Sequence, residues 1–92
     1  MLEINRELVL STAHVTQFEC NSDLVVLMNY SNDQMQIRLC IDGMQDQLNL
    51  LPVNELELYT NLINCIDAAN SLNCKWLVLD CDGQIAGFLP TF

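Results

Sequence analysis

The stretch NELELYTNLINCIDAANSLN (residues 54–73), followed after one cysteine by KWLVLD (residues 75–80), decides the fold class of this chain. In the first segment, apolar side chains recur at the spacing of one helical face and polar ones fall opposite. Asn54 can cap such a helix, and Asn73 can take the left-handed conformation that ends it. The pattern predicts one long helix over 54–72, followed by an apolar strand. The apolar face consists of Leu56, Tyr59, Leu62, Ile63, Ile66 and Ala69.

The segment before this helix predicts a short helix and most of a sheet. Thr16 and Glu19 have the spacing of a capping box, which indicates a short helix over 17–23. Apolar and polar residues alternate over 34–42, as in a strand with one face on a core. Further strands are predicted over 7–11, 24–30, 47–51 and 84–89, the last one returning from a hairpin turn at Asp82-Gly83.

These elements predict a two-layer α+β domain. Its mostly antiparallel or mixed sheet would contain four to five of these strands, packed by the long helix 54–72 and the short helix 17–23. A length of 92 residues predicts a single domain spanning 1–92. Such a domain buries enough surface for a core without metals or disulfides.

The charge of the chain is strongly negative, at −9 from twelve acidic and three basic residues. The basic residues are Arg6, Arg38 and Lys75, so the stretch 39–74 carries no cation. Such a surface repels nucleic acid and anionic membranes and attracts basic protein surfaces. We therefore expect no direct nucleic-acid binding and a basic partner, with a homodimer as a further option. The residues expected to contact the partner are Asp42, Asp46, Glu55, Glu57 and Asp67, together with Gln34 and Gln36 on the polar face of the strand over 34–42.

Cysteine and histidine usage indicates neither a metal site nor a cofactor. Five scattered cysteines and no signal peptide favour reduced thiols in the cytoplasm. There is no CxxC pair and a single histidine, His14, so a zinc site is not expected. No Gly-rich phosphate loop and no apolar run long enough to span a bilayer are present.

One segment resembles a catalytic motif. WLVLDCDG (residues 76–83) is similar to the nucleophile strand of haloacid-dehalogenase-type phosphatases. The resemblance implies Asp80 as nucleophile, Asp82 as proton carrier and both as magnesium ligands. However, Gln84 stands where that family commonly has Thr, and only ten residues follow Asp82, whereas the family's other catalytic groups follow this motif. The favoured interpretation is a turn, and the chain is expected not to be an enzyme.

His14 follows Ser11 and Thr12 at a predicted strand-to-helix turn. A catalytic role would need an orienting carboxylate and an anion hole, and the sequence shows neither. We expect these three side chains to form hydrogen bonds with the turn and the start of the helix.

Both ends of the chain resemble one family. LVLSTAHVT (residues 8–16) and NCKWLVLDCDGQIAGFLPTF (residues 73–92) look like small uncharacterised bacterial domains carried on plasmids, prophages and genomic islands. Members open with LSTAH, a hydrophobic residue and Thr, and close with C-x-W, D-x-D-G and L-P-x-aromatic. Asn73 departs from the family's usual Gly. The resemblance implies a mobile-element setting and favours proteins that act against host defences.

The leading hypothesis is an acidic mobile-element protein of the anti-CRISPR or anti-restriction type. It would inhibit a basic, nucleic-acid-handling defence complex by blocking the nucleic-acid site. Glu57 and Asp67 lie about 15 Å apart along a helix, whereas a DNA strand carries a charge every ~3.4 Å, so other segments must contribute carboxylates. The alternatives are a non-enzymatic interaction or regulatory module, including a homodimer, and a small hydrolase using Asp80 and Asp82.

Overall fold

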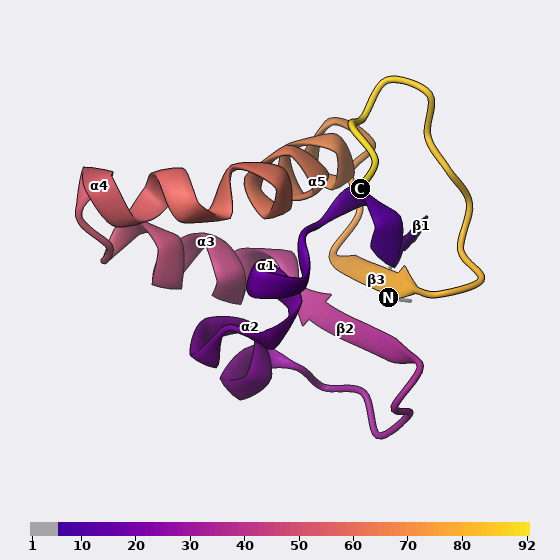
Figure 1. Ribbon diagram of the computed structural model, residues 1–92, viewed down its shortest axis with the longest axis horizontal. Coiled ribbons are helices and arrows are strands. Elements are labelled where there is room, and N and C mark those ends of the chain that lie inside the picture. Colours follow the sequence, from indigo (N-terminus) through magenta and orange to yellow (C-terminus); the bar gives the residue numbers. More distant parts are fainter. Residues whose placement is uncertain (1–5) are drawn as a thin grey trace, which may run out of the picture.

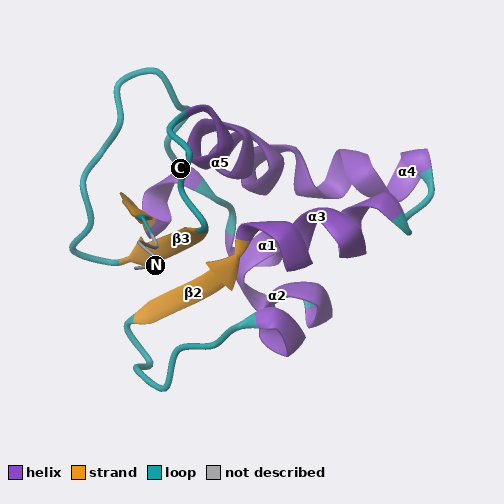
Figure 2. Ribbon diagram, turned by 180° about the vertical axis from the view of Figure 1, so that it is seen from behind, coloured by secondary structure: helices purple, strands orange, loops and turns teal. Residues whose placement is uncertain are grey.

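A three-stranded mixed sheet lies at one end of the molecule in the computed structural model, which describes residues 6–92 (Figures 1 and 2). The strand order is β1-β3-β2, with β3 parallel to β1 and antiparallel to β2. The α+β class and the mixed sheet are therefore confirmed. The strands are β1 (Glu7–Ser11), β2 (Gln36–Cys40) and β3 (Trp76–Asp80).

Helices cover one face of this sheet and extend beyond it. α3 and the α4–α5 segment run side by side as a helical hairpin that points away from the sheet (Figure 1). This hairpin gives the molecule its long dimension, 42 Å against 28 and 27 Å. The helices are α1 (Gln17–Asn21), α2 (Asp23–Met28), α3 (Ile41–Asn49), α4 (Val53–Leu56) and α5 (Thr60–Ser71), with 3₁₀ turns at Thr12–His14 and Glu57–Tyr59.

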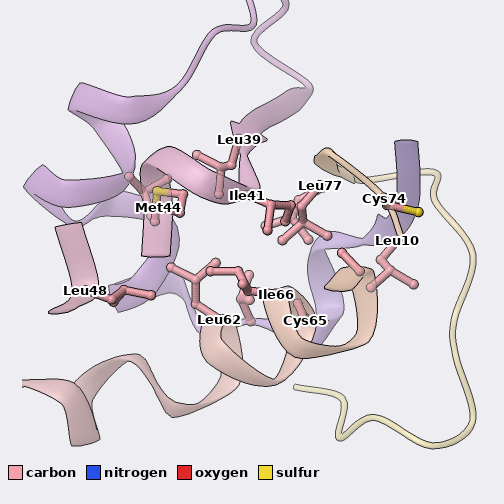
Figure 3. Close-up of a cluster of buried hydrophobic side chains, with 14 residues drawn as sticks. Leu10, Leu39, Ile41, Met44, Leu48, Leu62, Cys65, Ile66, Cys74 and Leu77 are labelled. Atoms are coloured by element: carbon pink, nitrogen blue, oxygen red, sulfur yellow. The ribbon is translucent and has the colours of Figure 1, made fainter. Parts of the chain in front are cut away.

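The hydrophobic core lies between the inner face of the sheet and the hairpin (Figure 3). Leu39 and Leu77 project from neighbouring strands toward Leu62 and Ile66 of α5, and Met44 of α3 closes the cluster. Each of these side chains is buried. The alternation predicted for 34–42 is confirmed within β2, where Leu39 faces the core and its neighbours lie on the opposite face.

The predicted long helix is present but is not a uniform α-helix. Helical structure begins at Val53, with Pro52 in the N-cap position, so the expectation of a cap at Asn54 was wrong. The 3₁₀ turn Glu57–Tyr59 interrupts it, and Tyr59 has φ −113° and ψ 21°. Asn73 has φ 56°, as predicted for a left-handed stop.

The helix end has the full Schellman pattern of hydrogen bonds. The N–H of Cys74 donates to the carbonyl of Ala69 at 2.9 Å, and the N–H of Asn73 donates to that of Asn70 at 3.0 Å. These bonds satisfy carbonyls that the end of a helix would leave free. They also turn the chain directly into β3.

The strand predicted over 24–30 does not form, because most of this segment belongs to the helix α2 (Asp23–Met28). Ser22 caps α2 by accepting from the N–H of Val25 at 3.4 Å, and Val25 is buried. The β-branched residues that suggested a strand are therefore held in a helix by the cap and by packing, which commonly override intrinsic propensity.

The strand predicted over 47–51 does not form either, because α3 begins directly after β2 and continues to Asn49. Asp42 lies in the first turn of α3, where a carboxylate favours the positive end of the helix dipole. Gly43 lies inside the helix, and a Cβ there would come 3.1 Å from Cε of Met28. Asp42-Gly43 therefore marks a place where α3 packs closely against α2.

The strand predicted over 84–89 does not form. β3 is the central strand and already pairs with β1 and β2, so a hairpin partner has no free edge to join. The chain instead crosses the end of β1, where the N–H of Ser11 donates to the carbonyl of Gln84 at 2.9 Å. Within residues 6–92 the sheet thus has three strands, not four to five.

Candidate functional site

The predicted partner-binding carboxylates all lie on the helical hairpin. Asp42 and Asp46 are one turn apart on α3, Glu55 is on α4, Glu57 is in the 3₁₀ turn and Asp67 is on α5, and all five are exposed. The sequence analysis had placed Asp42 at the end of a strand and Asp46 between two strands, which was wrong, whereas Glu55 does lie in the helical segment expected over 54–72. We call these five carboxylates the acidic helical surface.

Cations do not neutralise this surface. The basic residues lie in or next to the strands: Arg6 precedes β1, Lys75 precedes β3 and Arg38 is in β2. In the part of the chain that the structure describes, the ion pair formed is between Arg38 and Glu7. The Arg38 guanidinium also lies 4.4 Å from the ring centroid of Trp76, on the sheet face opposite the helices.

An apolar groove lies between the two arms of the hairpin. It has a volume of about 220 Å³, and Leu48 of α3 contributes to it opposite Leu56, Ile63 and Ile66 of α4 and α5. Asp67 also lines it. The acidic helical surface therefore includes a hydrophobic depression, which we call the α3–α5 groove.

Gln34 and Gln36 are separated from these carboxylates. Gln36 is the first residue of β2 and Gln34 lies in the turn before it, not in the strand as predicted, whereas α3 begins at the other end of β2. Gln36 Nε2 donates to Asp80 Oδ2 at 2.6 Å, so this side chain supports the end of β3. The predicted contact residues thus form two groups rather than one surface.

The Asp80–Gly83 segment is a hydrogen-bonded turn. Asp80 Oδ1 accepts from the N–H of Asp82 at 2.9 Å, and the other oxygen accepts from Gln36. The bond from the Asp82 backbone, with that from Gln36, holds the pKa of Asp80 below its usual value. Both oxygens of the candidate nucleophile are therefore engaged in building the turn.

The same turn contains a group of potential cation ligands. The ligand atoms of Asp80, Cys81 and Asp82 lie within 4.8 Å of one another, which is close enough to hold one cation. Desolvation, followed by the charges of Asp82 and Asp80, raises the pKa of the Cys81 thiol. The free Cys81 thiol is therefore a weak nucleophile at neutral pH.

His14 fastens the C-terminal segment, residues 83–92, to the fold. Its ring is buried, with Nδ1 2.8 Å from the carbonyl of Pro90 and Nε2 accepting from the N–H of Ala86 at 2.8 Å. An accepting Nε2 places the proton on Nδ1, which then donates to Pro90. Both ring nitrogens are thus in use, and the partners are in the C-terminal segment rather than the helix start that we expected. Ser11 does bond the turn, since its hydroxyl accepts from the N–H of Ala13 at 3.1 Å.

Glu19 is the important residue whose full role the sequence analysis missed. Its buried carboxylate accepts from the N–H and hydroxyl of Thr16, as the capping box predicted. It also accepts from Asn61 Nδ2 at 3.0 Å and from the N–H of Leu62 at 2.8 Å. The second pair lies in the first turn of α5, so one side chain caps two helices. The spacing of Thr16 and Glu19 signals the first cap, but no local pattern signals the second.

Comparison with known proteins provides a family but no activity. The profile described as "Family of unknown function (DUF5983) C-terminal domain" matches residues 7–92. No curated protein and no solved structure matches the chain. Among residues 6–92, no helix has the length and apolar character needed to cross a membrane.

Proposed function

The chain belongs to the DUF5983 C-terminal domain family, and from this premise we propose that it is an acidic protein that binds and inhibits a basic, nucleic-acid-handling protein of a bacterial host. The observation that carries the proposal is the acidic helical surface, whose five carboxylates are exposed and form no ion pair within residues 6–92. Uncompensated charge of one sign attracts a surface of the opposite sign over a distance of several ångströms.

The mechanism we propose is occupation of a cationic nucleic-acid site. Carboxylates on both arms of the hairpin supply negative charge over a wider area than one helix can. A bound acidic hairpin would exclude nucleic acid from the site by charge and by volume. The anti-CRISPR and anti-restriction types are the concrete forms of this proposal, acting in the host cytoplasm, and the resemblance of both chain ends to plasmid- and prophage-borne domains supports them.

An interaction or regulatory module, including a homodimer, is the second candidate. It is supported by exposed apolar side chains on α2, where Leu27 is 81% and Val26 63% exposed. Exposed apolar residues that cluster often mark contact surfaces. A hydrolase based on Asp80 and Asp82 has less support, since both oxygens of Asp80 already accept hydrogen bonds.

A phage-plaquing assay tests the proposed function. The protein is expressed in host strains that carry defined CRISPR or restriction systems, and the efficiency of plaquing of a targeted phage is measured. We expect the wild-type protein to restore plaquing against a susceptible system. A triple variant, Asp42→Asn, Asp46→Asn and Asp67→Asn, should lose this effect because the surface is neutralised.

The matched control removes the same charge elsewhere: Asp23→Asn, Asp33→Asn and Asp82→Asn lie outside the helical hairpin. This control should protect the phage as well as wild type does. Equal loss in both triple variants would contradict a role for the acidic helical surface, and no protection by wild type in any strain would contradict the proposed activity.

A further inference from the structure

The α3–α5 groove combines an apolar lining with a carboxylate. Its floor is apolar, formed by Leu48, Leu56, Ile63 and Ile66, while Asp67 lines its edge. At about 220 Å³ it is smaller than the ~300–1,000 Å³ of ordinary small-molecule pockets. It therefore suits the anchoring side chains of a protein segment better than a free ligand.

Carboxylates flank the groove on both sides. On α3, Asp42, Gln45 and Asn49 follow one another at spacings of three and four residues, so they share a helical face. Gln45 and Asn49 line the groove, which places Asp42 beside it, with Asp46 on the adjacent stripe. Asp67 provides the carboxylate on the α5 side, and no lysine or arginine occurs from residue 39 to residue 74.

We propose that the α3–α5 groove binds an amphipathic helix of the partner protein that carries basic residues. Apolar side chains of that helix would enter the groove, and lysines or arginines beside them would face Asp42 and Asp67. An amphipathic helix laid in a hydrophobic groove is an established mode of recognition. The proposal rests on the proposed function, because it names the element of the basic partner that the acidic helical surface recognises.

A second copy of this chain is a poor occupant of the groove. Each copy has a net charge of −9, and the residues that flank the groove are acidic. Bringing two such surfaces together places like charges side by side, which opposes association. Charge complementarity thus selects a basic partner over a homodimer at this site.

Synthetic peptides test the proposal directly. One helical peptide presents leucines on one face, flanked by lysines; a second replaces the lysines with glutamates; a third keeps the lysines but replaces the leucines with serines. Each is titrated into the ¹⁵N-labelled full chain while backbone amide shifts are followed. We expect the leucine–lysine peptide to shift the amides around Leu48, Ile63 and Ile66, and each control peptide to bind about tenfold or more weakly.

Variants of the protein separate the groove from the charge. Ile63→Gln should lower the affinity for the leucine–lysine peptide about tenfold. It should leave the weak binding of the serine–lysine peptide unchanged. Val26→Gln removes an exposed apolar residue of α2 and should change neither peptide's affinity. Preserved amide spectra of both variants show that the fold is intact.

The outcomes distinguish the two proposals. Equal affinity for the serine–lysine and leucine–lysine peptides would contradict binding in the groove. It would leave the acidic helical surface as the contact. Amide shifts confined to α2 would also contradict binding of the peptide in the groove. Failure of every lysine peptide to bind, or equal binding to the Asp42→Asn, Asp46→Asn, Asp67→Asn variant, would count against the proposed function itself.

Discussion

Glu19 joins two helices through one buried carboxylate. Its oxygens accept from the N–H and hydroxyl of Thr16, from Asn61 and from the N–H of Leu62. A glutamine in its place has one acceptor oxygen and one NH₂ group, so at least one buried donor of this set would face another donor. Glu19 is therefore a structural residue, and it does not belong to the acidic helical surface.

Replacing Glu19 by glutamine should lower the free energy of unfolding by about 1–3 kcal/mol, the cost of leaving a buried polar group without its partner. Chemical denaturation measures this value. The exposed control Glu57→Gln should change it by less than about 0.5 kcal/mol. Equal effects of the two variants would mean that the Glu19 contacts do not stabilise the fold.

Because the Cys65 thiol is buried, we expect the protein to lose stability at high pH. Burial raises its pKa from 9.0 to about 11, assisted by the charge of Glu19. A thiol with a raised pKa in the folded state contributes its full stability below the unfolded pKa, and this contribution is lost as the pH rises toward the folded pKa. The free energy of unfolding should therefore fall more steeply between pH 9 and pH 11 for wild type than for Cys65→Ala. Parallel curves for the two proteins would contradict this assignment.

At the scale of secondary-structure elements, the path of the C-terminal segment depends on one glycine and one histidine. A Cβ at Gly83 would collide with the backbone carbonyl of Leu10, whereas nothing lies within 4 Å of a Cβ at Gly87. The chain passes so close to the end of β1 that residue 83 must be glycine, whereas residue 87 need not be. Because neither glycine has a positive φ, steric contact alone distinguishes them.

The two glycines form a matched pair for mutation. Gly83→Ala should destabilise the protein by about 1–3 kcal/mol, since backbone atoms must move to make room. Gly87→Ala should be neutral or stabilise it by up to about 1 kcal/mol, because alanine restricts the unfolded chain. Thermal unfolding of both variants measures the difference, and equal midpoints would show that residues 83 and 10 are not in close contact.

The hydrogen bonds of His14 hold the C-terminal segment on the fold, so their loss should make this segment detach more easily. Without the imidazole, the N–H of Ala86 and the carbonyl of Pro90 lose their partners. His14→Ala should therefore speed hydrogen exchange at the amide of Ala86 about tenfold or more, as local opening becomes easier. The amide of Leu77 in the central strand should exchange as slowly as in wild type. Unchanged exchange at Ala86 would contradict the anchoring role.

Features that depend on local sequence were predicted from the sequence, whereas elements that depend on tertiary contacts were not. The capping box at Thr16 and Glu19 and the helix stop at Asn73 depend on local contacts, and both predictions were confirmed. Residues 24–30 and 84–89 were misassigned because their conformations depend on tertiary partners. α2 is fixed by the burial of Val25, and the last segment is excluded from the sheet because β3 already has two neighbours.

At the scale of the whole molecule, charge is distributed unequally. The basic residues lie in or next to the strands, while five acidic residues lie exposed on the helical hairpin. The sequence alone identified these five carboxylates and the cation-free stretch that contains them. It could not identify the α3–α5 groove, because that feature exists only once α3, misassigned in part as a strand, packs against α5.

The central claim is that the acidic helical surface binds a basic partner, and the most direct measurement is the affinity for the captured host protein as a function of salt. The partner is isolated on immobilised wild-type protein at low salt, identified, purified and titrated at increasing salt concentration. We predict that it is basic and that its affinity falls as salt rises. We also predict that the Asp42→Asn, Asp46→Asn, Asp67→Asn variant binds about tenfold or more weakly, whereas the matched Asp23→Asn, Asp33→Asn, Asp82→Asn control does not. A partner that is not basic, or an affinity that is indifferent to salt, would contradict the claim.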